Sequence, residues 1–150
     1  MPQSLSYVLV HMVYGTKSRT PWISEEMQPR LHGYLATVLK DKGNTPIIVG
    51  GHTDHVHLLF GLSRSMTVSS VAEVTKVSSS KWIKETFPER QSFAWQQGYG
   101  AFGVSESHRE VVTAYISNQA IHHEKVSFQD EIREIFREAG LTLDERYFWD

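Results

Sequence analysis

The sequence has no cysteine, no long apolar run and little net charge. Without cysteine it can form no disulfide, which fits a reducing compartment. A chain of 150 residues is long enough to bury a core without such cross-links. No apolar stretch approaches the roughly 20 residues that span a membrane, and the first residues lack the basic-then-apolar pattern of a signal peptide. We therefore expect a soluble, cytoplasmic protein in which residues 1–150 form a single domain.

The chain also lacks the excess of basic residues that many nucleic-acid-binding proteins carry. Its formal net charge is −2, so any contact with an anionic polymer has to come from local groups of basic side chains. Charge alone favours an ordinary solvated surface of mixed sign. The candidates for local basic contacts are Lys17, Arg19, Lys76, Lys81 and Lys84.

Hydrophobic periodicity predicts an alternation of strands and helices. Residues 5–14 are apolar on both alternating faces, which is typical of a central strand covered on both sides. Ser24 can cap a helix that ends at Gly43, although Pro29 then requires a later start or a kink. Further strands are predicted at 45–50 and 55–62, shorter ones at 93–95 and 101–105, and further helices at about 67–86, 107–122 and 127–139.

The order of these elements is β-α-β-β-α-β with additional C-terminal helices. The simplest architecture is an α+β fold, a ferredoxin-like or RRM-like antiparallel sheet with two helices on one face. The other face is left for a ligand, a partner or the C-terminal helices. The stripes expected to pack on the sheet are Met27, Leu31, Leu35 and Val38 in the first helix, and Val68, Val71, Thr75, Ser78 and Trp82 in the second.

Histidine is abundant, with eight residues, and two of them form a His-Val-His sequence on a predicted strand. Because side chains alternate along a strand, His55 and His57 project to one face, whereas Val56, Leu58 and Phe60 project to the other. Two neighbouring imidazoles can bind one divalent ion and leave room for a third ligand. A lone His-X-His is more often a pair of hydrogen-bonded structural residues. The apolar face opposite strengthens the metal interpretation and leaves both open.

A second group of polar residues recurs at helical spacing between residues 111 and 123. Tyr115, Gln119 and His122 lie on one stripe of the predicted helix, together with Val111. A tyrosine packed by its ring is the ordinary interpretation of such a position. A stripe that combines Tyr, Gln and His is unusual in a purely structural role, since each needs a polar partner when covered. Gln119, one turn from Tyr115, could supply a neutral oxygen ligand.

Together the two groups indicate phosphodiester chemistry. A divalent cation neutralises and orients a phosphate, and attack by Tyr115 leaves a covalent phosphotyrosine. That link conserves the energy of the broken bond, so a second strand end can reseal it without ATP. Consistent with this, the sequence contains no phosphate-binding glycine loop of the Walker type.

The sequence resembles the single-tyrosine transposases of the HUH class (histidine, hydrophobic, histidine) and their REP-associated relatives, which move single-stranded insertion sequences. The matching segments are residues 54–60 (DHVHLLF), 95–105 (WQQGYGAFGVS), 115–123 (YISNQAIHH) and 144–149 (DERYFW). They follow one another in order over nearly the whole chain.

The resemblance implies that His55, His57 and Gln119 hold Mg²⁺ or Mn²⁺ and that Tyr115 attacks single-stranded DNA. It further implies a 5′-phosphotyrosine intermediate, recognition of hairpins near the ends of an element, and a homodimer in which Tyr115 can serve the histidine pair of either subunit. Asp54 either orients an imidazole or closes a turn. His122 either contacts metal or phosphate or is a helix C-terminal histidine favoured by the dipole. His11 and His52 are expected to be structural.

Three other functions stay open at this point. A metal-dependent nuclease or hydrolase would activate water and form no covalent adduct. A nucleic-acid-binding module on an RRM-like sheet would expose aromatic residues on its central strands, where this sequence has histidines. A domesticated relative would keep the site without moving an element.

Overall fold

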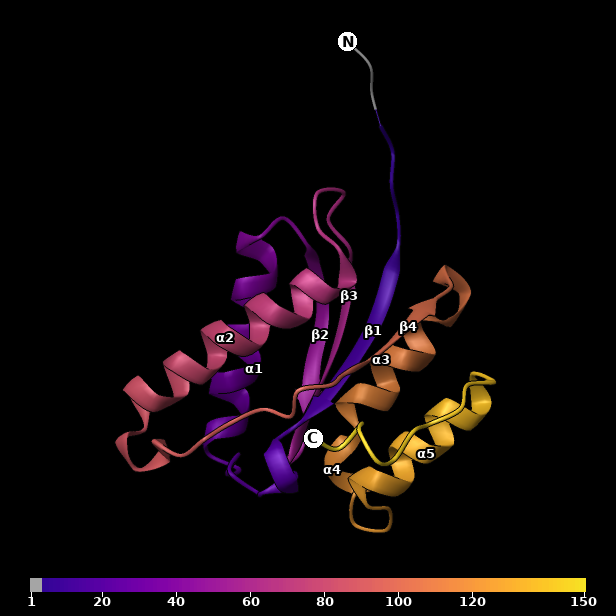
Figure 1. The fold of residues 1–150 in the computed structure, drawn as a ribbon. Helices are drawn as coiled ribbons and strands as arrows, with labels where there is room; N and C mark the ends of the chain where they lie inside the picture. Colours follow the sequence, from indigo (N-terminus) through magenta and orange to yellow (C-terminus); the bar gives the residue numbers. More distant parts are fainter. Residues whose placement is uncertain (1–3) are drawn as a thin grey trace.

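Four strands form one antiparallel sheet in the computed structural model, which describes residues 4–150 (Figure 1). The strands are β1 (Leu9–Gly15), β2 (Thr45–Gly51), β3 (His55–Gly61) and β4 (Gly100–Val104). Their order across the sheet is β2-β3-β1-β4. With one helix between β1 and β2 and another between β3 and β4, this is the predicted ferredoxin-like arrangement.

Strand β1 is central and is buried along its whole length, as its two-sided apolar pattern predicts. It begins at Leu9, however, and not at residue 5. Leu9 pairs with the last residues of both neighbouring strands, Gly61 and Val104, so the chain before it has no strand on either side with which to form a ladder. Leu5 and Tyr7 are consequently 89% and 62% exposed.

Helices α1 (Met27–Asp41) and α2 (Val68–Thr86) cover one face of the sheet and enclose the main core. All four predicted stripe residues of α1 are buried. The helix starts at Met27, so Pro29 falls in its first turn, where the absent N–H costs no helical bond, and no kink is needed. Its C-terminal end is followed by Gly43, whose φ of +90° suits a residue without Cβ.

The buried stripe of α2 differs from the prediction by a rotation about the helix axis. Val71 and Thr75 are buried as predicted, but the stripe continues through Ser79 and Ile83 and not through Ser78 and Trp82. Ser79 accepts a hydrogen bond from the indole Nε1 of Trp95 at 2.9 Å, which satisfies both buried polar groups. Trp82 is half-buried and stacks on Tyr34.

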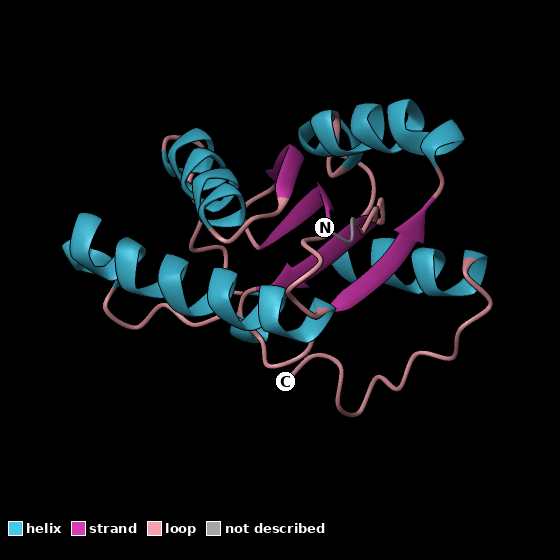
Figure 2. Ribbon diagram, turned by 90° about the horizontal axis from the view of Figure 1, so that it is seen from above, coloured by secondary structure: helices cyan, strands magenta, loops and turns pink. Residues whose placement is uncertain are grey.

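Helices α3 (Arg109–Ser117), α4 (Gln119–His122) and α5 (Phe128–Glu138) lie on the other face of the sheet, as the two views together show (Figure 2). The prediction of one continuous helix over residues 107–122 is wrong. Asn118 adopts φ −98° and ψ 18°, which separates α3 from α4. The segment 93–95 is also not a strand and contributes one isolated bridge, Thr16 with Trp95.

A smaller core joins α5 and the C-terminal segment to this second face. Val13 of β1 packs with Phe128 and Ile132 of α5, and Phe148 and Trp149 pack around them. The backbone of Gln97 donates to the carbonyl of Asp150 at 2.9 Å, so the end of the chain is fastened to the segment before β4. Within residues 4–150, no helix has both the length and the apolar character needed to cross a membrane.

Candidate active site

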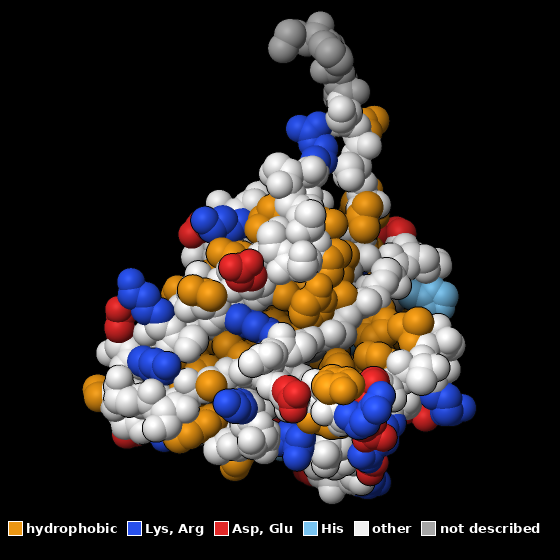
Figure 3. Space-filling view, in the orientation of Figure 1, with side chains coloured by type: hydrophobic (Ala, Val, Ile, Leu, Met, Phe, Trp, Pro, Cys, Tyr) orange, Lys and Arg blue, Asp and Glu red, His pale blue; other side chains and the backbone are white. Residues whose placement is uncertain are grey.

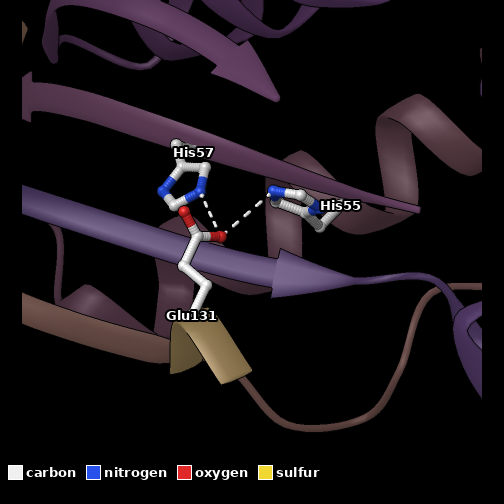
Figure 4. A group of neighbouring side chains, drawn as sticks. All are labelled: His55, His57 and Glu131. Atoms are coloured by element: carbon white, nitrogen blue, oxygen red, sulfur yellow. Dashed lines mark hydrogen bonds and ion pairs between the residues drawn. The ribbon is translucent and has the colours of Figure 1, made fainter. Parts of the chain in front are cut away.

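His55 and His57 lie at the beginning of β3 and point away from the main core. They pair with Gly15 and Val13 of the central strand, and both side chains are fully buried. Val56 and Leu58, between and after them, pack with α1 and α2 in the main core, as the alternation predicts. The two imidazoles therefore face the layer formed by α3, α4 and α5 (Figure 4).

Each of the two imidazoles is held by a hydrogen bond at its Nδ1 atom. Asp54 Oδ1 lies 2.8 Å from His55 Nδ1, and His11 Nε2 lies 2.8 Å from His57 Nδ1. Partners of this kind fix the orientation of a histidine ring and leave its Nε2 free to act as a ligand. The backbone carbonyl of Asp54 also accepts from Thr16 N at 2.8 Å, so Asp54 both closes the turn and contacts the ring.

Both Nε2 atoms point at Glu131, a residue of α5 that the sequence analysis did not single out (Figure 4). Glu131 Oε1 lies 3.3 Å from His55 Nε2 and 3.2 Å from His57 Nε2. Its side chain is 1% exposed. The carboxylate sits in the first turn of α5, where the helix dipole favours a negative charge.

Gln119, the predicted third ligand, belongs to the same cluster. Its Oε1 lies 2.8 Å from His55 Nε2, and its amide Nε2 donates to Glu131 Oε2 at 2.9 Å. His123, which was not predicted, places Nε2 at 2.9 Å from Gln119 Oε1 and 3.2 Å from Glu131 Oε1. Gln119 and His123 follow the break at Asn118, because a new helix, α4, begins at Gln119.

Tyr115, the predicted nucleophile, completes the cluster from α3. Its hydroxyl donates a hydrogen bond to Glu131 Oε2. The ring centroid lies 5.7 Å from that of His57 and 5.5 Å from that of His122. A single chain thus brings together Tyr115, both histidines of the pair and Gln119, which are separated by up to 64 residues in sequence.

His122 contributes to the same cluster but is less enclosed. It is the last residue of α4, as the dipole interpretation requires, and its side chain is 31% exposed. Its Nε2 lies 3.4 Å from Glu131 Oε2 and makes no hydrogen bond. His52 lies outside the cluster and stacks on the ring of His123, with the centroids 5.4 Å apart.

Burial and the carboxylates set the protonation of these groups. Burial works against a charge on His55, but Asp54 and Glu131 outweigh it and raise its pKa to about 9. For His57 burial prevails over Glu131 and lowers the pKa. Burial opposes ionisation of Glu131 too, yet hydrogen bonds from the surrounding histidines keep its pKa below the usual value. Burial and then the charge of Glu131 raise the pKa of Tyr115, so its hydroxyl is protonated at neutral pH.

The donor set fits a divalent cation. Nε2 of His55, Nε2 of His57 and a carboxylate oxygen of Glu131 lie within 4.8 Å of one another, and all three residues are buried. Imidazole nitrogens with carboxylate and amide oxygens suit ions such as Mn²⁺, and carboxylate and amide oxygens also suit Mg²⁺. His122, His123 and Glu131 form a second such group around the same carboxylate.

A cleft of about 1000 Å³ opens beside Tyr115, between β4, α3 and α5. Apolar side chains such as Phe102 and Val112 form part of its wall and could receive a nucleotide base. Glu134 and Glu138 line it along α5 and would repel a phosphate that lies close to them. The cleft therefore suits the base of a substrate better than its backbone along the α5 side.

The predicted basic residues do not gather around this cleft. Lys81 and Lys84 lie on α2, whose buried side packs on the sheet face opposite to that of Tyr115. Lys17 is exposed, and the Arg19 guanidinium lies 5.4 Å above the ring of Trp149. On the face shown in Figure 3, basic and acidic side chains are interspersed around exposed hydrophobic ones.

Lys76 has a structural role that its position in the sequence did not reveal. Its ammonium donates to the carbonyl oxygens of Gln96, Gln97 and Gly98 at 2.8, 3.0 and 2.8 Å. These bonds use all three of its hydrogens, so a phosphate would have to compete with the backbone carbonyls for them. Burial lowers its pKa to about 8. In this structure Lys76 fastens the segment before β4 to α2, and its contact with DNA stays a prediction.

Comparisons with known proteins agree with this fold and identify a family. The family described as "Transposase IS200 like" matches residues 4–119, and the chain belongs to this family. A comparison with curated proteins finds no similar sequence. The family match confirms the resemblance stated from the sequence and covers both Tyr115 and Gln119, but it ends before α5.

Two solved structures share the fold. A Deinococcus radiodurans R1 protein that has been assigned as a transposase is 24% identical, with a TM-score of 0.64, over 79% of this chain and 98% of its own. A REP-associated tyrosine transposase bound to a REP hairpin is 15% identical, with a TM-score of 0.58, over 84% of this chain and 74% of its own. At these identities the similarity concerns the fold.

Proposed function

We propose that this transposase cuts and rejoins single-stranded DNA through a covalent 5′-phosphotyrosine at Tyr115, assisted by Mg²⁺ or Mn²⁺ held by His55, His57 and Gln119. One observation carries the proposal. A single buried carboxylate, that of Glu131, contacts the hydroxyl of Tyr115, the amide of Gln119 and the Nε2 atoms of both histidines. The nucleophile and the ligands inferred from separate motifs therefore lie within reach of one phosphate group.

The chemistry follows from the side chains that surround Tyr115. The hydroxyl of Tyr115 gives up its proton as its oxygen attacks the phosphorus, and the bond from phosphorus to the 3′-oxygen breaks. The 3′-oxygen takes up one proton and leaves as a 3′-hydroxyl, so no proton is gained or lost overall. In the reverse step a 3′-hydroxyl attacks the phosphotyrosine and the tyrosine recovers its proton. Because the pKa of Tyr115 is raised by burial and by Glu131, the hydroxyl needs its environment to become more positive before it reacts.

A bound divalent cation would supply that positive charge and neutralise the phosphate. The protein's own contribution is orientation. Asp54 and His11 hold the two imidazoles with their Nε2 atoms facing inward, and the hydrogen bond to Glu131 fixes the hydroxyl of Tyr115. The burial of both histidines excludes water from the ligand atoms and strengthens every charge interaction in the site.

The substrate we propose is single-stranded DNA that carries a hairpin near its cleavage site. The similarity in fold to a transposase that was solved with a REP hairpin supports this choice. The candidates for contacts with DNA away from the cleaved bond are still Lys17, Arg19, Lys76, Lys81 and Lys84. We also propose a homodimer, in which each chain contains a complete site, because Tyr115 lies beside the histidines of its own chain.

The test is a covalent-adduct assay. The protein is incubated with Mn²⁺ or Mg²⁺ and single-stranded DNA covering the hairpins that flank its gene, and the products are separated on a denaturing gel. A protein–DNA band that disappears in Tyr115→Phe and with a chelator supports the proposal. Tyr147→Phe, which removes the hydroxyl of an exposed tyrosine, is the matched control and should keep the band. Cleavage that persists in Tyr115→Phe without an adduct would instead identify a hydrolase.

A further inference from the structure

We infer that Glu131 is a ligand of the divalent cation, so that the ion joins helix α5 to the sheet. This inference rests on one part of the proposed function, namely that a divalent cation binds at His55 and His57. Glu131 lies beyond the residues 4–119 that the family match covers. The metal site then has a ligand from the C-terminal helix in addition to the two histidines of β3 and Gln119 of α4.

The first support is the convergence of nitrogen atoms on one carboxylate oxygen. Nε2 of His55, His57 and His123 lie 3.3, 3.2 and 3.2 Å from Glu131 Oε1. Ligands that bind one cation side by side at about 2.1 Å stand about 3 Å apart. The spacing of the donor atoms is therefore close to that of ligands around a shared ion, and Figure 4 shows both imidazoles directed at the carboxylate.

The second support is the free-energy cost of burying the Glu131 carboxylate when no ion is bound. Glu131 is almost fully enclosed, and a buried charge is expensive unless it is paired. In the structure its two oxygens face the Nε2 atoms of three histidines, the amide of Gln119 and the hydroxyl of Tyr115. A divalent cation bound among these groups would place a full positive charge directly beside the enclosed carboxylate.

The third support is that the apolar residues of α5 place Glu131 beside the two histidines. Phe128 and Ile132 of α5 are buried against Val13 of the sheet. Glu131 follows Phe128 by three positions and therefore neighbours it on the helix surface, and it is buried like Phe128 and Ile132. Packing of these apolar side chains therefore delivers the carboxylate to the two histidines, whereas Glu134 and Glu138 on the same helix are exposed.

The experiment measures Mn²⁺ binding in the absence of DNA. We expect isothermal titration to give one tight site in the wild-type protein and an affinity at least about tenfold lower in Glu131→Gln, whose amide is a weaker ligand. Glu138→Gln removes an exposed carboxylate from the same helix and should change the affinity by less than about twofold. A Glu131→Gln protein that binds Mn²⁺ as well as the wild type, or a wild type that does not bind it, would overturn the inference.

Hydrogen exchange of the wild-type protein provides a test that needs no substitution. If Glu131 is a ligand, Mn²⁺ should slow the exchange of the amides in residues 128–138, because the ion fastens α5 to the sheet. Unchanged or faster exchange there would overturn the inference. The adduct assay is separate: Mn²⁺ binding that depends on Glu131 without any tyrosyl adduct leaves this inference standing and rejects the proposed function.

Discussion

The hydroxyl of Tyr115 and the carboxylate of Glu131 share a hydrogen bond within one chain. Glu131 in turn contacts His55 and His57 of the same chain. Tyr115 and the histidine pair therefore lie together within one chain, and we propose that they act in cis.

This relationship predicts the outcome of mixing two inactive variants. His57→Ala lacks a proposed metal ligand and Tyr115→Phe lacks the proposed nucleophile. In the proposed dimer with sites built in cis, a mixed dimer therefore contains one defect in each site. We expect the mixture to form no more covalent adduct than either variant alone. If each site combined residues from two subunits, a mixed dimer would contain one intact site, and recovered adduct would show this.

The contact between Asp54 and His55 predicts a loss of metal affinity. Asp54→Ala removes the acceptor that fixes the His55 ring, and outer-shell changes of this kind typically cost 10- to 100-fold in affinity or activity. We expect Mn²⁺ affinity and adduct formation to fall together by roughly that amount. The control is Asp41→Ala, which removes an exposed carboxylate at the end of α1. Equal affinities of the two variants would contradict the orienting role.

Much of this site could be predicted because it depends on local periodicity. Alternation along β3 places His55 and His57 on one face, and helical spacing brings Tyr115 near Gln119. The same periodicities give the element order and hence the ferredoxin-like sheet. The roles of His55, His57, Tyr115 and Gln119 in metal binding and catalysis stay predictions. The proximity of these four side chains is a feature of the structure.

Glu131 was missed because its partners are set by tertiary packing. It lies 74 residues from His57, and no local pattern specifies that pairing. A signal was nonetheless present: an acidic residue stands on the apolar face of α5 beside Phe128 and Ile132, where an unpaired charge would be costly. The break at Asn118 and the capture of Lys76 by backbone carbonyls also depend on surrounding structure and not on sequence spacing.

Two glycines predict opposite effects of the same substitution. A Cβ on Gly50 of β2 would lie 2.7 Å from Ile116 Cγ2 and 2.8 Å from Ile116 O, so Gly50→Ala pushes α3 from the sheet and displaces the neighbouring Tyr115. We expect a loss of about 1–3 kcal/mol in the free energy of unfolding and a clear loss of adduct.

Gly33 in α1 has open space around it, so Gly33→Ala should stabilise the protein by about 0.5–1 kcal/mol. Urea denaturation measures both, and equal stability of the two variants would argue against close packing of α3 on β2.

His32 on α1 predicts how stability depends on pH. Burial lowers its pKa from 6.5 to about 4, and the neighbouring charges of His55 and His57 act in the same direction. Below pH 6.5 the unfolded chain therefore takes up a proton that the folded protein does not accept until about pH 4, so the free energy of unfolding falls as the pH falls through this window. Each such proton contributes a slope of up to about 1.4 kcal/mol per pH unit.

Other histidines add to the wild-type slope. The informative quantity is therefore the difference in slope between the wild type and His32→Gln, measured by urea denaturation between pH 6.5 and 4. We expect the variant to show a shallower slope. Parallel curves would mean that His32 titrates alike in the folded and unfolded chains.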